Sequence, residues 1–111
     1  ISSTAGKRGS IGQVNYAAAK SGLYGITMTA ALEWARYGIR VNSVGFGTVE
    51  TPMTETIRSE RFRERTLARI PLGRIAQPAK VAPLICFLLS EAASFITGQN
   101  WIEDGGSHMQ P

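Results

Sequence analysis

The chain has 111 residues, of which 43% are hydrophobic and 18% are charged, proportions typical of a packed, soluble protein and not of a disordered one. No apolar run approaches the roughly 20 residues that a membrane-spanning helix needs, so no membrane partner is expected. The single cysteine, Cys86, has no internal disulfide partner, which favours a reducing, cytoplasmic setting.

The net charge is +4, and much of the basic excess lies in residues 58–74, RSERFRERTLARIPLGR. One interpretation is a patch for phosphate, nucleic acid or an acidic protein. The favoured alternative is a solvated helix face, because glutamates alternate with the arginines. A nucleic-acid partner is not expected, since aromatic residues are not interleaved with the basic ones as stacking platforms would be.

In chain order, residues 1–3 have the composition of the end of a buried strand, and residues 4–12 that of a loop. Because the sequence starts at Ile1 inside such a strand, we expect it to be a fragment of a longer domain. A long helix is predicted from about Gln13 or Asn15 to Tyr37, ended by Gly38 in a left-handed cap. Gly22 and Gly25 lie inside this helix and suggest that another element, from this chain or a second subunit, packs closely against it.

Residues 39–44 predict a strand, because they are short and β-branched. A turn-rich loop follows, then one or two short charged helices in residues 53–69. A helix is predicted for residues 79–90, where Pro83 is tolerable only if it falls in the first turn. Residues 97–104 predict a last strand, followed by a tail in which His108 has no second metal ligand spaced near it, so no metal site is expected.

Strands that alternate with helices predict an α/β fold with a parallel sheet covered on both faces. Only two complete strands and the stub at Ile1 are present, fewer than such a sheet needs. The sequence therefore predicts one partial domain, residues 1–111.

Tyr16 and Lys20 are four residues apart in the first predicted helix, so their side chains share a face. A free tyrosine has a pKa of about 10, and a neighbouring ammonium group favours its phenolate form. Such a pair can transfer a proton near neutral pH. In isolation the pattern is equally compatible with two polar side chains that have no chemistry between them.

The pair is accompanied in sequence order by further segments, ISSTAGKRG, GQVNYAAAKSGL, GIRVNSVGFGTVETPM, CFLLSEAASFITGQ and DGG. Together they resemble the second half of a classical short-chain dehydrogenase/reductase, most closely the branch of 3-oxoacyl-acyl-carrier-protein reductases. The resemblance implies the C-terminal part of a Rossmann-type, doubly wound parallel sheet (an αβα sandwich). It also implies hydride transfer between a nicotinamide cofactor, NAD or NADP, and a carbonyl or secondary alcohol such as a 3-oxoacyl thioester.

By the same resemblance, Tyr16 is the catalytic acid/base and also contacts the cofactor, Lys20 supports it and binds the nicotinamide ribose, and Ser3 holds the substrate carbonyl. Only the family spacing selects Ser3, because the residues alone do not favour it over Ser2 or Ser10.

The resemblance assigns nicotinamide contacts to the loop after the second strand, with Gly47, Val49 and Thr51 at matching positions. Phe46 stands where the family usually has proline, so the loop loses a fixed φ angle and gains a ring. That ring either stacks on the nicotinamide, lines the substrate pocket, or is neutral.

Residues 53–69 match the family's mobile substrate lid, with Pro52, Met53 and Ile57 as expected pocket residues. The regions from residue 79 onward match a common subunit interface, so a homodimer or homotetramer is expected. Trp101 is predicted to lie in the core or at that interface rather than to contact a ligand.

The glycine-rich turn that holds the cofactor diphosphate precedes Ile1 in the family. AGKRGSIG does not replace it, because it does not lie between a strand and a helix at phosphate-binding spacing and the family places it beside the substrate. A complementary N-terminal segment or chain is therefore an expected partner. Two alternatives to the enzyme remain open: a truncated, non-catalytic remnant that acts as a scaffold, and a basic module that binds an acidic partner.

Overall fold

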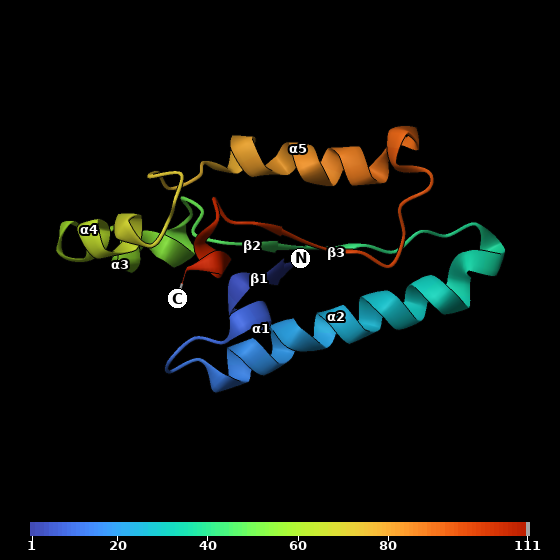
Figure 1. Cartoon of the computed structure of the whole chain (residues 1–111), viewed down its shortest axis with the longest axis horizontal. Coiled ribbons are helices and arrows are strands. Elements are labelled where there is room, and N and C mark those ends of the chain that lie inside the picture. The colour runs from blue at the N-terminus through green and yellow to red at the C-terminus, as the bar shows by residue number, and fades with distance from the viewer. Residues whose placement is uncertain (111) are drawn as a thin grey trace.

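The computed structural model describes residues 1–110, which form a three-stranded parallel sheet between two helical layers (Figure 1). The strands are β1 (Ser2–Ser3), β2 (Ser43–Phe46) and β3 (Asn100–Glu103), in the order β1-β2-β3. Helix α2 (Val14–Trp34) covers one face and α5 (Pro78–Leu89) covers the other. The predicted α/β class and the short strand stub at the start of the chain are confirmed.

On the α2 face, small side chains allow the helix to approach the sheet. Ser2 and Gly45 are paired neighbours in β1 and β2, and both are buried. A Cβ atom added at Gly45 would lie 2.9 Å from Ile102 Cδ1 and 3.2 Å from the Tyr24 hydroxyl oxygen. Helix α2 runs into a 3₁₀ turn, η1 (Ala35–Tyr37), and ends at Gly38 with φ 72°, as predicted.

On the α5 face lies the apolar core. Its centre is formed by Val44, Leu88 and Ala93, and further side chains pack around these three: Phe46, Leu84, Ile85, Ile96 and Trp101. The prediction that Trp101 belongs to the core is therefore confirmed.

The sequence predicts that Pro83 is tolerable only in the first turn of the helix, but in α5 it lies outside that turn. The helix begins at Pro78, so Pro83 is its sixth residue and stands in the helix interior. Its ring is exposed to solvent, and the apolar side chains on the opposite face of α5 hold the helix against the sheet despite the missing N–H donor.

Two predicted boundaries also differ from the structure. Residues 4–12 are not all loop, because Thr4–Arg8 form the short helix α1, whose first turn is capped by Ser3 Oγ accepting from Ala5 N at 3.2 Å. The second strand is Ser43–Phe46 instead of residues 39–44. Val41 and Asn42 precede it because their polar groups bond to residues 96–99 outside the ladder, as in Val41 N to Thr97 Oγ1 at 3.1 Å.

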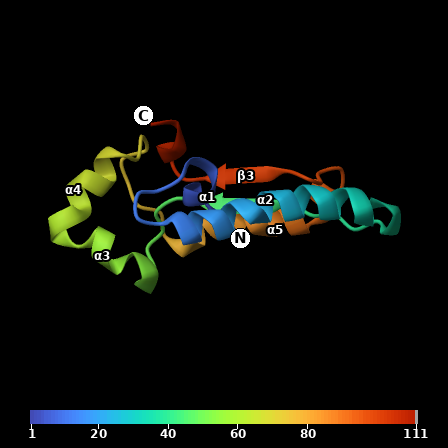
Figure 2. The same ribbon diagram turned by 90° about the horizontal axis from the view of Figure 1, so that it is seen from below.

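The charged segment after β2 forms η2 (Pro52–Thr54), α3 (Glu55–Arg58) and α4 (Glu60–Ala68). The prediction of short helices in this segment is therefore confirmed. Figure 2 shows α3 and α4 projecting beyond the end of the sheet toward which the strands point. Two more 3₁₀ turns, η3 (Glu91–Ala93) and η4 (Ser107–Met109), flank β3. In the part of the chain that the structure describes, no helix has both the length and the apolar character needed to cross a membrane.

Candidate active site

The candidate site lies at the carboxyl ends of the three strands. Ser3 ends β1, Phe46 ends β2 and Glu103 ends β3, and the three residues are paired across the sheet. In open parallel α/β sheets this edge is where ligands bind.

Tyr16 and Lys20 lie in the first turns of α2, and both side chains are half-buried. Lys20 Nζ is 5.7 Å from the centroid of the Tyr16 ring, so the predicted proximity of the two side chains is confirmed. Lys20 Nζ also donates to the carbonyl oxygen of Ile1 at 3.1 Å. No hydrogen bond of the Tyr16 hydroxyl is found among the described residues, which leaves this group free for a ligand.

The helix segment that carries Lys20 is held against β1 and α1 by several contacts. Ser2 Oγ donates to the Lys20 carbonyl at 2.8 Å, and Ser21 Oγ donates to the Gly6 carbonyl at 2.6 Å. The Tyr24 hydroxyl donates to the Ser3 carbonyl at 3.1 Å. These bonds join two successive turns of α2 to β1 and α1.

Gly6 is the closest point of this contact. A Cβ atom at residue 6 would lie 2.7 Å from the carbonyl carbon of Lys20 and 2.9 Å from its Cβ, so only glycine fits there without displacement. Sequence reasoning missed Gly6, and the only signal for it was a small residue between Ser3 and the helix.

The structure separates the three serines that the residues alone left equivalent. Ser2 is 4% exposed, and its hydroxyl is used by the Lys20 carbonyl. Ser10 is exposed in the loop between α1 and α2. Ser3 is half-buried at the end of β1 and its Oγ accepts from Ala5 N, which leaves its own O–H available to donate.

The loop after β2 is held on both sides. Gly47 N donates to the Glu103 carbonyl at 3.1 Å, and a Cβ atom at residue 47 would lie 2.6 Å from Asp104 Cβ. Val49 is buried and forms a parallel bridge with Ala76. Thr51 caps η2 through a capping box with Thr54. Gly47, Val49 and Thr51 thus present a fixed backbone beside the strand ends.

Phe46 packs against the core cluster around Val44 on the α5 side of the sheet. This position gives the aromatic ring a structural role that the sequence did not indicate. Because Phe46 stands at the strand end next to Gly47 and beside Ser3 in register, a ligand contact stays a prediction.

The end of β3 carries a hydrogen-bonded cluster that sequence reasoning did not find. The Asp104 carboxylate accepts from Gly106 N, Ser107 Oγ and His108 N, and its Oδ2 lies 3.0 Å from His108 Nδ1. Burial raises the pKa of Asp104, but these hydrogen bonds outweigh it and hold the pKa below its usual value. The cluster fixes η4 against the loop that contains Gly47.

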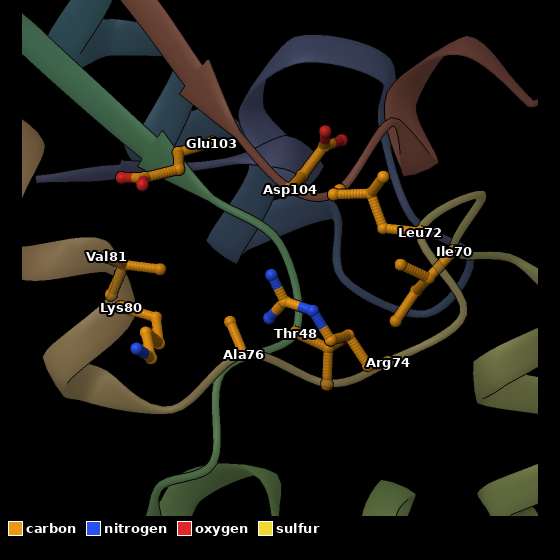
Figure 3. A pocket seen from close by; sticks show the side chains of 10 residues that line it. Thr48, Ile70, Leu72, Arg74, Ala76, Lys80, Val81, Glu103 and Asp104 are labelled. Atoms are coloured by element: carbon orange, nitrogen blue, oxygen red, sulfur yellow. The ribbon is translucent and has the colours of Figure 1, made fainter.

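A cavity of about 110 Å³ lies between the end of β3, residues 70–76 and the start of α5. Figure 3 shows the side chains that line it. Glu103, Arg74 and Lys80 line it. Glu103 Oε2 is buried without a hydrogen-bond partner among the described residues, and burial raises the pKa of this carboxyl group. Of the predicted site residues, none lines this cavity.

The described residues fit the nicotinamide end of a dinucleotide and not its diphosphate. Near the strand ends they provide the free hydroxyl of Tyr16, the ammonium group of Lys20 and the half-buried loop residues Gly47 and Thr51. The positive-φ glycines Gly9 and Gly12 lie between two helices, α1 and α2, rather than between a strand and a helix, so within residues 1–110 they do not form a diphosphate-binding turn. The same residues hold no cluster of three metal-ligating side chains.

A parallel sheet sandwiched between helices, with a tyrosine–lysine pair at its carboxyl edge, defines part of a Rossmann-type α/β domain. Residues 1–108 match the family model described as enoyl-(acyl carrier protein) reductase. The chain belongs to the short-chain dehydrogenase/reductase family.

Curated relatives agree with this assignment. The chain is 51% identical over 106 residues to a 3-oxoacyl-(acyl-carrier-protein) reductase of Thermotoga maritima, and 47% identical over 109 residues to a (3R)-3-hydroxyacyl-CoA dehydrogenase of Rattus norvegicus. The alignments cover 96% and 98% of this chain, but 43% and 42% of those proteins. The chain thus spans less than half the length of these relatives.

Solved structures show the same relationship. A short-chain dehydrogenase/reductase from Mycobacterium ulcerans superposes with a TM-score of 0.94 at 33% identity, covering 99% of this chain and 40% of that one. A polyketide ketoreductase for actinorhodin, the F189W variant with NADPH, superposes with a TM-score of 0.92 at 38% identity, covering 99% and 46%. The Rossmann-type fold is therefore confirmed.

Proposed function

We propose that this chain is the catalytic half of an NAD(P)-dependent oxidoreductase that acts on a carbonyl or secondary alcohol, with 3-oxoacyl thioesters as the favoured substrates. The observation that carries the proposal is the Tyr16–Lys20 pair at the carboxyl edge of the sheet, with a free tyrosine hydroxyl. The names of the relatives support the substrate class, since they describe a 3-oxoacyl reductase and a hydroxyacyl-CoA dehydrogenase.

In this proposal each residue has one task. The Tyr16 hydroxyl gives its proton to the substrate oxygen during reduction and takes it back during oxidation. The Lys20 ammonium favours the phenolate that forms on Tyr16. The Ser3 hydroxyl donates a hydrogen bond to the same substrate oxygen and orients the carbonyl.

The nicotinamide, when bound, supplies or accepts the hydride. Lys20 would hold its ribose, and the loop residues Gly47, Val49 and Thr51, with Phe46 beside them, would hold its carboxamide end. Because NAD and NADP are identical at that end, the proposal covers both. The related polyketide ketoreductase was solved with NADPH, which supports a nicotinamide cofactor.

We also propose that the protein works in the cytoplasm as a homodimer or homotetramer. The close packing expected at Gly22 and Gly25 is not found within the described chain, where no atom lies within 4 Å of a Cβ added at either residue. The same helix exposes Ile26 and Leu32, with exposed fractions of 63% and 82%. A second subunit that packs on α2 would explain both features.

The test is Tyr16→Phe in the complete protein that contains this chain. We expect kcat to fall at least about 100-fold, because the acid/base group is removed, while the affinity for NAD(P)H measured by fluorescence is retained. Tyr37→Phe is the matched control, since Tyr37 is an exposed tyrosine at the far end of α2. If Tyr16→Phe turns over as fast as the native protein, the proposed chemistry is wrong.

A further inference from the structure

A second, larger cavity of about 630 Å³ opens between the loop at residues 9–11, helix α4 and the turn η4. Its volume lies in the range of small-molecule sites. Four basic side chains line it: Arg8, Arg65, Arg69 and His108. Among the described residues, no aspartate or glutamate lines it. They come from three separate parts of the chain, so only the fold brings them together.

Arg65 and Arg69 are four residues apart at the end of α4, and therefore share one face of the helix. Like charges at this spacing destabilise a helix. The ion pairs found in residues 1–110 are Arg58–Glu50 and His108–Asp104, so neither Arg65 nor Arg69 has an acidic partner there. Their guanidinium groups are exposed and available to an anion.

The other two basic groups are held in place by the protein. Arg8 Nη1 donates to the Ser107 carbonyl at 2.8 Å and to the Gln110 carbonyl at 3.4 Å. The Nδ1 atom of His108 is taken by Asp104 at 3.0 Å, which leaves Nε2 free. Guanidinium groups bind phosphate oxygens in pairs of charge-assisted hydrogen bonds. A phosphate monoester, such as the ribose phosphate of coenzyme A, carries a charge of about −1.5 to −2, whereas the phosphate that joins a pantetheine arm to its carrier is a diester and carries less charge.

We propose that this cavity binds a phosphate group carried by the substrate. The proposal rests on the proposed function for one step: the loop at residues 9–11, which lines the cavity, connects α1, which Ser3 caps, to α2, which carries Tyr16. Acyl thioesters are carried on a pantetheine arm that ends in a phosphate. Among the described residues, no phenylalanine, tyrosine or tryptophan lines the cavity, which argues against a stacked nucleobase as the bound group.

The experiment measures, by calorimetry, the binding of two matched pairs of probes to the complete protein. It is done at low salt, where exposed charges are least screened. The first pair is pantetheine 4′-phosphate and pantetheine, and the second is coenzyme A and 3′-dephospho-coenzyme A. We expect the phosphate-bearing member of at least one pair to bind about ten-fold more tightly, as a hydrogen-bonded charge predicts. A difference in the first pair identifies the phosphate that joins the arm to its carrier, and a difference in the second identifies the ribose phosphate of coenzyme A.

The double variant Arg65→Gln/Arg69→Gln should remove this difference. Arg61→Gln/Arg63→Gln is the matched control, because it removes the same charge from the same helix at exposed residues that do not line the cavity. Arg8 is unsuitable as a test, since it also holds η4. Unchanged thermal unfolding of both variants shows that they are folded.

The proposal is overturned if neither probe pair is distinguished, or if the control variant loses the difference as fully as Arg65→Gln/Arg69→Gln does. Failure of the proposed function has a different signature, because calorimetry does not require turnover. If Tyr16→Phe remains active while the arginine-dependent preference for phosphate persists, the phosphate site stands and the assigned chemistry is wrong.

Discussion

Gly6→Ala tests whether the contact between α1 and α2 positions Lys20. The added Cβ atom would lie 2.7 Å from the Lys20 carbonyl carbon, and 2.9 Å from both Lys20 Cβ and Ser21 N. Since ordinary van der Waals contact begins at 3.4 Å, the helix backbone or α1 must move by about 0.7 Å. The contact is to backbone atoms, which cannot swing aside as the end of a long side chain can.

Overpacking of this kind typically costs about 1–3 kcal/mol. Alanine regains up to about 1 kcal/mol of helix propensity, because residue 6 lies within α1. We therefore expect the free energy of unfolding to fall by about 1–2 kcal/mol. We also expect kcat to fall at least about ten-fold, because displacement of a catalytic group by a fraction of an ångström weakens its alignment with the substrate.

The free energy of unfolding is measured by urea denaturation and kcat by the absorbance of reduced nicotinamide, both with the complete protein. Lys7→Ala is the control, since it changes the next, exposed residue of α1 and should alter stability by less than about 0.5 kcal/mol. A Gly6→Ala variant with native stability and native kcat would refute the idea that this contact sets the place of Lys20.

Three further predictions concern the strand ends. Asp104→Asn should lower the free energy of unfolding at pH 7 by about 1–3 kcal/mol, because a buried carboxylate loses its charge-assisted bonds. Because the pKa of Asp104 is lowered in the folded state, this stability is present above a pH of about 4 and is lost as the pH falls through the folded pKa. The stabilities of the native protein and of Asp104→Asn should therefore converge in acid denaturation curves. A difference in stability that persists at low pH would contradict this. Glu103→Gln should raise the free energy of unfolding at pH 7, because the raised pKa of Glu103 means that the folded state loses stability as the pH rises from about 4 through that pKa. A less stable Glu103→Gln variant in urea at pH 7 would indicate that the carboxylate is paired. Phe46→Pro, which restores the residue usual in the family, should lower stability by about 1–3 kcal/mol through lost core packing and weaken NAD(P)H binding; unchanged affinity and turnover would exclude a cofactor role for Phe46.

The local features of the fold could be predicted because they depend on neighbours in sequence. The helix from Val14 to Trp34, its end at Gly38 and the adjacency of Tyr16 and Lys20 all follow from helical spacing and from glycine in the left-handed region. Helix α1 was missed because its first turn depends on capping by Ser3, whereas its composition is that of a loop.

By itself, the sequence determined the α/β class, the parallel order of elements and the tyrosine–lysine pair, since periodicity and i, i+4 spacing are local properties. Only the tertiary structure decided that the hydroxyl of Ser2 is engaged while that of Ser3 is available at the strand end, why residue 6 is glycine, and that Arg8 and His108 lie beside Arg65 and Arg69. Each of these depends on contacts between segments far apart in the chain, and no local pattern records such contacts. The interior position of Pro83 has the same origin, because burial of the apolar face of α5 outweighs one missing backbone hydrogen bond.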